Sequence, residues 1–188
     1  MTSTLEVAAN VIATLSILLA SRNHVHTWTF GVLGCLAFAW LYFESRLYAD
    51  VMLQFFFIVT SVLGWSRWRH SGRVATVAQE RPVTHVRFKV LALSLPAGAM
   101  GALAYGQLLH ATTDAWAPFA DSFVLAFSIV AQWLLVRRHV ETWPVWLLVN
   151  SISVPLFASR GLYLTAAVYA IYWLNAWYGW RRWHEFAR

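Results

Sequence analysis

Charged side chains are scarce in this chain, at 12% of its 188 residues, whereas soluble domains carry about 25%. Hydrophobic residues make up 60%, and a water-exposed surface cannot be built from such a composition. A single cysteine, Cys35, excludes an internal disulfide, and the lack of partner thiols excludes a cysteine zinc site. We expect Cys35 to serve packing, and we expect the chain to lie in a lipid bilayer.

The hydrophobic residues fall into seven runs of about 16 to 22 residues, long enough for a helix to cross the roughly 30 Å hydrocarbon layer. The runs cover residues 5–21, 28–43, 47–66, 88–109, 118–136, 143–158 and 161–180. The first run contains Glu6 and follows no positive charge, so we interpret it as a helix and not as a signal peptide. The predicted fold class is an all-α integral membrane protein with seven transmembrane helices, and residues 1–188 form one membrane domain.

The basic residues predict the orientation of these helices. If successive runs cross in alternation, all Arg and Lys residues fall on one side except Arg46 and Arg160. The positive-inside rule places the richer side in the cytoplasm, so the N-terminus lies outside the inner membrane and the C-terminus inside the cell. The loop from His70 to Lys89 is then cytoplasmic. This bias also explains the net charge of +6 without nucleic acid as a partner.

A comparison of the chain with itself at an offset of 115 residues aligns 19–70 with 134–185 without a gap. Fourteen positions are identical, including the tryptophan pairs Trp28/Trp143, Trp65/Trp180 and Trp68/Trp183. Each copy contains three runs, and both copies enter the membrane in the same direction. We predict repeat one at 5–70, a linking helix at 88–109 and repeat two at 118–185, the parallel arrangement of SWEET sugar transporters. In repeat transporters the solute site lies near mid-membrane between the halves.

Polar and indole side chains within the last three runs are the candidate solute ligands, because a polar group in hydrocarbon needs a partner or a solute. The alternative is that they join helices, as polar groups in membrane bundles commonly do. At the 115-residue offset Asn150 corresponds to Cys35 and Asn175 to Thr60, so the second repeat is the richer in ligands. The candidate substrate-binding residues are Gln132, Trp133, Trp143, Trp146, Asn150, Tyr169, Tyr172 and Asn175. We expect Trp146 and the three amides, Gln132, Asn150 and Asn175, to converge at mid-membrane.

The remaining motifs favour structural roles. The Gly-Trp-x-Arg-Trp segments at 64–68 and 179–183 suit an anchor at the membrane boundary, where indoles and guanidiniums meet lipid headgroups. The seven histidines lie near the ends of the runs, and no carboxylate or cysteine cluster accompanies them, so we expect no metal. No nucleophile elbow or phosphate loop is present, so we expect neither an enzyme nor a cofactor. No acidic residue lies deep within a run, so we expect transport without an ion gradient.

Four segments carry a resemblance to a known family: 19–24 leading into 28–31, Trp143-x-x-Trp146-x-x-x-Asn150, 160–165 and 178–183. Together, and over nearly the whole chain, they resemble the PnuC family of vitamin transporters. The family's usual proline after the first tryptophan is Thr29 here, although its repeat partner Pro144 is present.

The resemblance implies a 3+1+3 fold and facilitated diffusion of nicotinamide riboside or a closely related phosphate-free precursor, which a cytoplasmic kinase would trap by phosphorylation. Thiamine, riboflavin and deoxynucleosides are the alternatives within the family. A membrane enzyme or an interaction subunit is the alternative outside it. The sequence allows a homo-oligomer and does not determine one.

Overall fold

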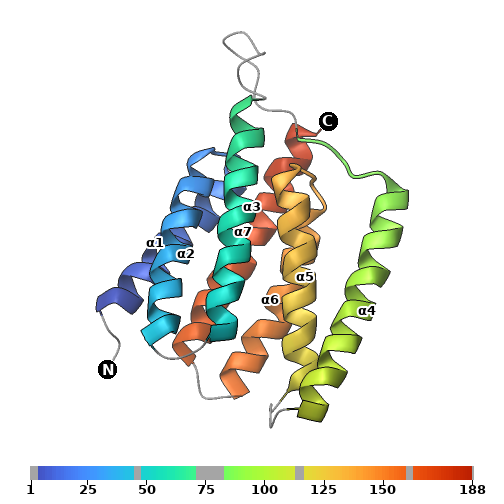
Figure 1. Ribbon diagram of the computed structural model, residues 1–188. Helices are drawn as coiled ribbons and strands as arrows, with labels where there is room; N and C mark the ends of the chain where they lie inside the picture. Colours follow the sequence, from blue (N-terminus) through green and yellow to red (C-terminus); the bar gives the residue numbers. More distant parts are fainter. Residues whose placement is uncertain (1–3, 45–47, 71–82, 113–116, 160–162, 188) are drawn as a thin grey trace. The chain divides into compact units, whose positions relative to one another are not determined.

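Seven helices make up the part of the chain that the computed structural model describes, residues 4–44, 48–70, 83–112, 117–159 and 163–187 (Figure 1). The prediction of an all-α fold with seven helices is confirmed. The helices are α1 (Thr4–Ser21), α2 (His26–Glu44), α3 (Tyr48–His70), α4 (Phe88–Thr112), α5 (Pro118–Val136), α6 (Thr142–Ser159) and α7 (Tyr163–Phe186). Most of the loop predicted to be cytoplasmic, 71–82, and the start of the 160–165 motif lie outside the described residues.

Helices α3 and α7 extend beyond the hydrophobic runs that predicted them. The last run was expected to end at residue 180, whereas α7 continues to Phe186. The added turns carry Arg, Trp and Glu, which keep helical backbone geometry at little cost outside the hydrocarbon. A hydrophobic run therefore marks the segment that crosses the hydrocarbon, whereas the helix itself continues beyond that segment.

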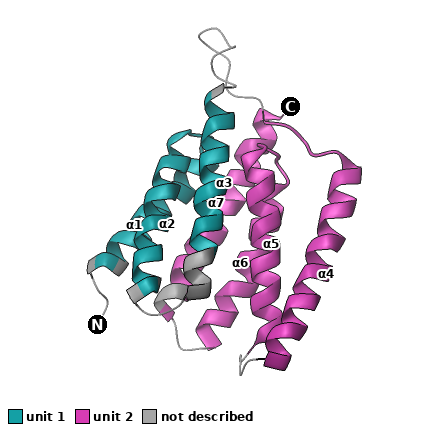
Figure 2. Cartoon of the chain, in the orientation of Figure 1, with its two compact units in different colours: residues 1–82 teal, residues 83–188 magenta. Residues whose placement is uncertain are grey.

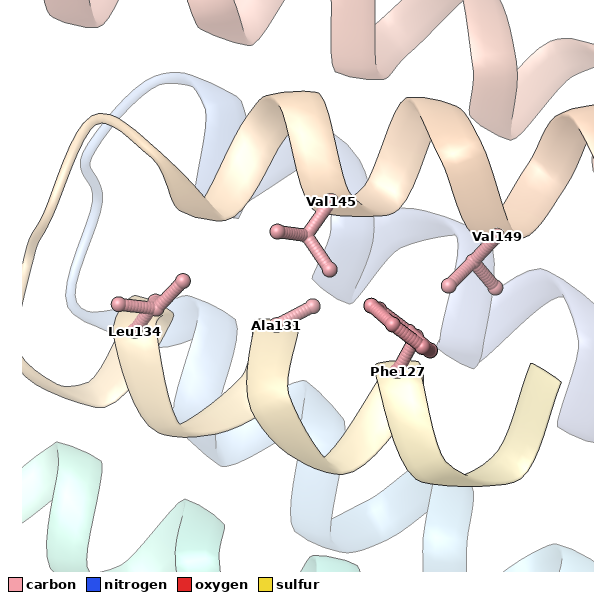
Figure 3. Close-up of a cluster of buried hydrophobic side chains, with 5 residues drawn as sticks. All are labelled: Phe127, Ala131, Leu134, Val145 and Val149. Atoms are coloured by element: carbon pink, nitrogen blue, oxygen red, sulfur yellow. The ribbon is translucent and has the colours of Figure 1, made fainter. Parts of the chain in front are cut away.

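The chain divides into two compact units (Figure 2). In residues 1–82, α2 packs against both α1 and α3. In residues 83–188, α4 packs on α5, α5 on α6 and α6 on α7. The buried core of this second unit joins α5 to α6, whose side chains point toward one another in Figure 3: Phe127, Ala131, Leu134, Val145 and Val149.

The loops that follow α1 and α5 have the same geometry. Asn23 and Arg138 occupy equivalent positions at the 115-residue offset, and both have a positive φ, of 54° and 59°. In each loop the amide of the next residue, His24 or His139, donates at 3.0 Å to a carbonyl five residues earlier. This is the hydrogen-bond pattern that closes a helix with a left-handed residue.

A threonine then ties each loop to the helix before it. Thr27 Oγ1 donates to the carbonyl of Ser16 at 2.8 Å, and Thr142 Oγ1 donates to the carbonyl of Ala131 at 2.7 Å. These four residues also correspond at an offset of 115. The identities found in the sequence are thus matched by identical local contacts in the two units.

Apolar side chains cover much of the described surface. Leu93, Met100 and Leu103 of α4 are 63–74% exposed, a degree of apolar exposure that water disfavours over a contiguous face. By length and composition, α4 and α5 are the described helices that pass a strict test for spanning a membrane.

Candidate functional site

A tryptophan clamp closes one end of the α6–α7 pair. The rings of Trp143 and Trp183 meet edge to face, with centroids 5.2 Å apart and an interplanar angle of 88°. A Cβ on Gly179 would lie 2.8 Å from the ring of Trp143, so only glycine permits this approach. Trp143 is 2% exposed, and its position makes it a packing residue of the α6–α7 pair.

The first unit contains the same clamp between α2 and α3. Trp28 and Trp68 meet at 5.1 Å and 88°, and a Cβ on Gly64 would lie 2.6 Å from the ring of Trp28. Each of these residues corresponds to a clamp residue of the second unit at an offset of 115. The clamp is therefore a feature of both repeats and does not distinguish the half that holds the solute.

Two further contacts define how α6 and α7 run past each other. Trp173 Nε1 donates to Ser151 Oγ at 3.0 Å, and the rings of Phe157 and Tyr169 lie 4.9 Å apart. Together with the clamp, these contacts describe an antiparallel pair in which Asn150 lies at the level of residues 174–175 of α7.

Asn150 and Asn175 are both buried, at 3% and 7% exposure. Asn150 follows Trp143 by seven residues, and Asn175 precedes Gly179 by four, so both lie on the helix faces that meet at the clamp. The structure therefore brings these two predicted ligands to the same level of the α6–α7 interface.

Aromatic rings lie on either side of this level along α6 and α7. Trp146 is half-buried and packs against the α5–α6 core, between the core residues Val145 and Val149 and one turn before Asn150. Tyr169 and Tyr172 lie 5.6 Å apart on α7, and Phe157 continues the cluster from α6. Sequence reasoning named the two tyrosines but missed Phe157, because a phenylalanine in an apolar run carries no signal of its own.

Gln132 and Trp133 lie at a different level, although we expected the amides to share one depth. The bond from Thr142 to the carbonyl of Ala131 places the start of α6 beside this part of α5. Asn150 is eight residues further along α6, which is about 12 Å of helix rise. Gln132 is buried, and Trp133 lies under the guanidinium of Arg137, whose Cζ is 4.1 Å from the ring centre.

The first unit also holds buried polar side chains that sequence reasoning passed over. Gln54 and Ser61 of α3 are 9% and 3% exposed. At the 115-residue offset Gln54 corresponds to Tyr169. Tracing the candidate ligand Tyr169 back to the first repeat at this offset would have identified Gln54.

A short segment before α4, residues 83–86, is attached to the loop between α5 and α6. We call this segment the strap. The amide of Thr84 donates to the carbonyl of Arg138 at 3.1 Å, and the amide of Val140 donates to the carbonyl of Thr84 at 3.1 Å. These bonds form an isolated parallel bridge, which attaches the segment before α4 to the loop between α5 and α6.

Glu141 fastens the strap with both carboxylate oxygens. Oε1 lies 2.9 Å from Nδ1 of His85, and Oε2 accepts a 2.9 Å hydrogen bond from the amide of Val86. The ring of His184 from α7 lies 5.5 Å from that of His85. Burial lowers the pKa of the neighbouring His139, and nearby Arg137 adds to this, against the raising effects of Thr84 and Glu141.

Known proteins resemble this chain over almost its full length. The family model described as nicotinamide mononucleotide transporter matches residues 3–185. The nicotinamide riboside transporter PnuC of Escherichia coli is 27% identical, with 99% of this chain and 87% of the relative aligned. The riboflavin/roseoflavin transporter RibM of Streptomyces davaonensis is 28% identical, with 95% and 83% aligned.

A crystal structure of the vitamin B3 transporter PnuC has the same fold. Its TM-score is 0.77 at 24% sequence identity, and the match covers 97% of this chain and 81% of the other. At that identity the likeness concerns the fold. It accounts for the seven-helix order that the sequence predicted.

The fold and the relatives define a class: this is a polytopic membrane transporter and not an enzyme. The chain belongs to the nicotinamide mononucleotide transporter family, which includes the PnuC proteins. The family assignment made from the sequence motifs is thereby confirmed.

Proposed function

We propose that this protein takes up nicotinamide riboside or a closely related vitamin precursor through a site between α6 and α7. The observation that carries the proposal is the pair of buried amides, Asn150 and Asn175, at one level of that interface. An amide offers paired donors and acceptors, which suit ribose hydroxyls and a carboxamide. Buried in an apolar interior without such a solute, each amide would have to be satisfied by its neighbours alone.

The aromatic rings supply the second half of the recognition. Trp146, one turn before Asn150 on α6, offers a flat face for the heterocycle, and Tyr169 and Tyr172 lie further along α7, on the other side of the amides. The nicotinamide ring of the riboside is a pyridinium, and a cation held over an aromatic face is attracted to it by about 0.5–2 kcal/mol. Gln132 and Trp133 lie about 12 Å from the level of Asn150 along the helix axis. Trp143 packs the helix pair that bears the site.

The absence of charge in this region favours a phosphate-free solute. Neither α6 nor residues 163–180 of α7 contains a charged side chain. The phosphate of a mononucleotide would need a guanidinium or ammonium partner in this apolar setting. We therefore propose the riboside over the mononucleotide named in the family's description.

Riboflavin is the second candidate, because a relative at 28% identity is named a riboflavin/roseoflavin transporter. Its larger tricyclic ring would need more stacking surface than one indole provides. Thiamine and deoxynucleosides are further family alternatives with flat rings of similar size.

We also propose that the two units are built on parallel repeats, 5–70 and 118–185, with 88–109 as the linking helix. The matched loops, threonine bonds and tryptophan clamps support this SWEET-like 3+1+3 arrangement. The basic residues support an inner-membrane orientation with the N-terminus outside. Phosphorylation of the solute by a cytoplasmic kinase would give uptake its direction without an ion gradient.

Binding measurements on the purified protein test the substrate assignment. Isothermal titration with nicotinamide riboside, nicotinamide mononucleotide, riboflavin, thiamine and thymidine should give the tightest binding for the riboside and a much weaker signal for the mononucleotide. Tighter binding of riboflavin would move the assignment to the second candidate. Equal binding of riboside and mononucleotide would contradict the charge argument.

A further inference from the structure

Tryptophan–arginine pairs recur at the C-terminal ends of three helices. Arg69 lies over Trp65 on α3 with 4.9 Å between Cζ and the ring centre, and Arg181 lies over Trp177 on α7 at 5.1 Å. On α5 the corresponding separation is 4.1 Å. In each pair the arginine follows the tryptophan by four residues, one turn along the helix face.

These pairs are not copies left by the repeat. At an offset of 115, Trp65 corresponds to Trp180 and Arg69 to His184, whereas the α7 pair is Trp177 and Arg181. The same arrangement has therefore been built from different positions. In a membrane protein, an indole with a guanidinium at a helix end is suited to headgroup depth.

The pair on α7 borders a hollow. The hollow is open, has a volume of about 550 Å³, and is lined by Trp177, Trp180, Arg181, His184 and Glu185. The rings of Trp177 and Trp180 meet edge to face at 5.4 Å, which gives it an apolar wall. Within the described residues no carboxylate lies within salt-bridge distance of Arg181.

The hollow carries both signs of charge in a fixed order along α7. Arg181 leans back toward Trp177, away from Glu185, which is one turn further along, about 6 Å on the helix axis. From the hydrocarbon outward the order is indoles, guanidinium and carboxylate. A phospholipid with an amine headgroup has the same order of acyl chains, phosphate and ammonium.

We propose that this hollow is a binding site for phosphatidylethanolamine, with the phosphate on Arg181 and the ammonium on Glu185. The glycerol and upper acyl chain then lie against Trp177 and Trp180. Phosphatidylglycerol carries a neutral glycerol head in place of the ammonium, so it offers Glu185 no cation. Phosphatidylcholine has no N–H to donate to the carboxylate.

Lipid binding to the purified, delipidated full chain tests this proposal, by native mass spectrometry with each of the three phospholipids. We expect the wild type to bind phosphatidylethanolamine more tightly than the other two. Arg181→Gln should weaken that binding about tenfold, the usual effect of losing one charge-assisted hydrogen bond. Arg22→Gln is the matched control, because it removes the same charge from an exposed side chain with Leu18, and no aromatic ring, one turn earlier.

Glu185→Gln gives an independent readout that does not depend on how Arg181→Gln folds. It should abolish the preference for phosphatidylethanolamine over phosphatidylglycerol while phosphatidylglycerol binding stays or rises. Equal binding of all three lipids to the wild type would overturn the proposal. So would a preference that survives Glu185→Gln, or equal losses in Arg181→Gln and Arg22→Gln.

Discussion

A methyl group added at Gly179 tests whether the close approach of α6 and α7 depends on glycine. The new Cβ would lie 2.8 Å from ring carbons of Trp143, closer than real Cβ contacts come. The ring is 2% exposed and packs against Trp183, so it has no space into which to move. Overpacking of this kind costs about 1–3 kcal/mol.

Gly101→Ala is the matched control, because among the described residues no atom lies within 4 Å of a Cβ at Gly101. Both substitutions gain helix propensity, worth about 0.5–1 kcal/mol, so the difference between the variants isolates the clash. For a chain of this size 1 kcal/mol changes Tm by about 2–4 °C. Gly179→Ala should therefore unfold at least about 2 °C below Gly101→Ala in a thermal melt of the purified protein. Equal melting temperatures would refute this account of the clamp.

Three further predictions concern the loops. Burial lowers the pKa of His139, so the unfolded chain takes up a proton on this histidine sooner as the pH falls below the usual histidine pKa of about 6.5. The free energy of unfolding should therefore fall as the pH drops through that value. In His139→Asn this dependence of stability on pH should flatten. Glu141→Gln weakens the fastening of the strap, so hydrogen exchange at the amide of Val86 should quicken while exchange at Val149 in the core stays slow. A cysteine in the 71–82 loop, Ser71→Cys in a Cys35→Ala background, should resist an impermeant thiol reagent in intact cells; rapid labelling would reverse the proposed orientation.

The repeat explains why so much of the fold could be predicted. Thr27 and Thr142 were recognised as identical positions in the sequence, and both make the same bond to the preceding helix. Asn23 and Arg138 are not identical, yet both adopt a positive φ. The backbone geometry is thus more strongly repeated than the sequence, because it depends on the neighbouring contacts as well as on the residue itself.

The level of each candidate ligand could not be predicted in the same way. Helical spacing placed Asn150 on one face of α6, but the spacing within a helix says nothing of its register against the next helix. That register follows from the threonine bond on α5 and from the contacts between α6 and α7. As a result Gln132 lies about 12 Å from the level at which it was expected.

The strap could not be predicted from the sequence for a related reason. His85 and Glu141 are separated by 56 residues, and neither stands in a recognisable motif. Their pairing depends on the path of the chain before α4, which hydrophobic runs do not encode.

Binding of nicotinamide riboside to Asn150→Leu tests the central proposal most directly. Loss of one buried hydrogen bond costs about 1–3 kcal/mol, which is roughly one to two decades in affinity. Isothermal titration should therefore show riboside binding weakened by about 10- to 100-fold, with the protein still folded and inserted. Cys35→Ala, at the equivalent position of the first repeat, should leave affinity nearly unchanged. Equal and small effects of the two substitutions would show that Asn150 only joins helices, and would contradict a solute site between α6 and α7.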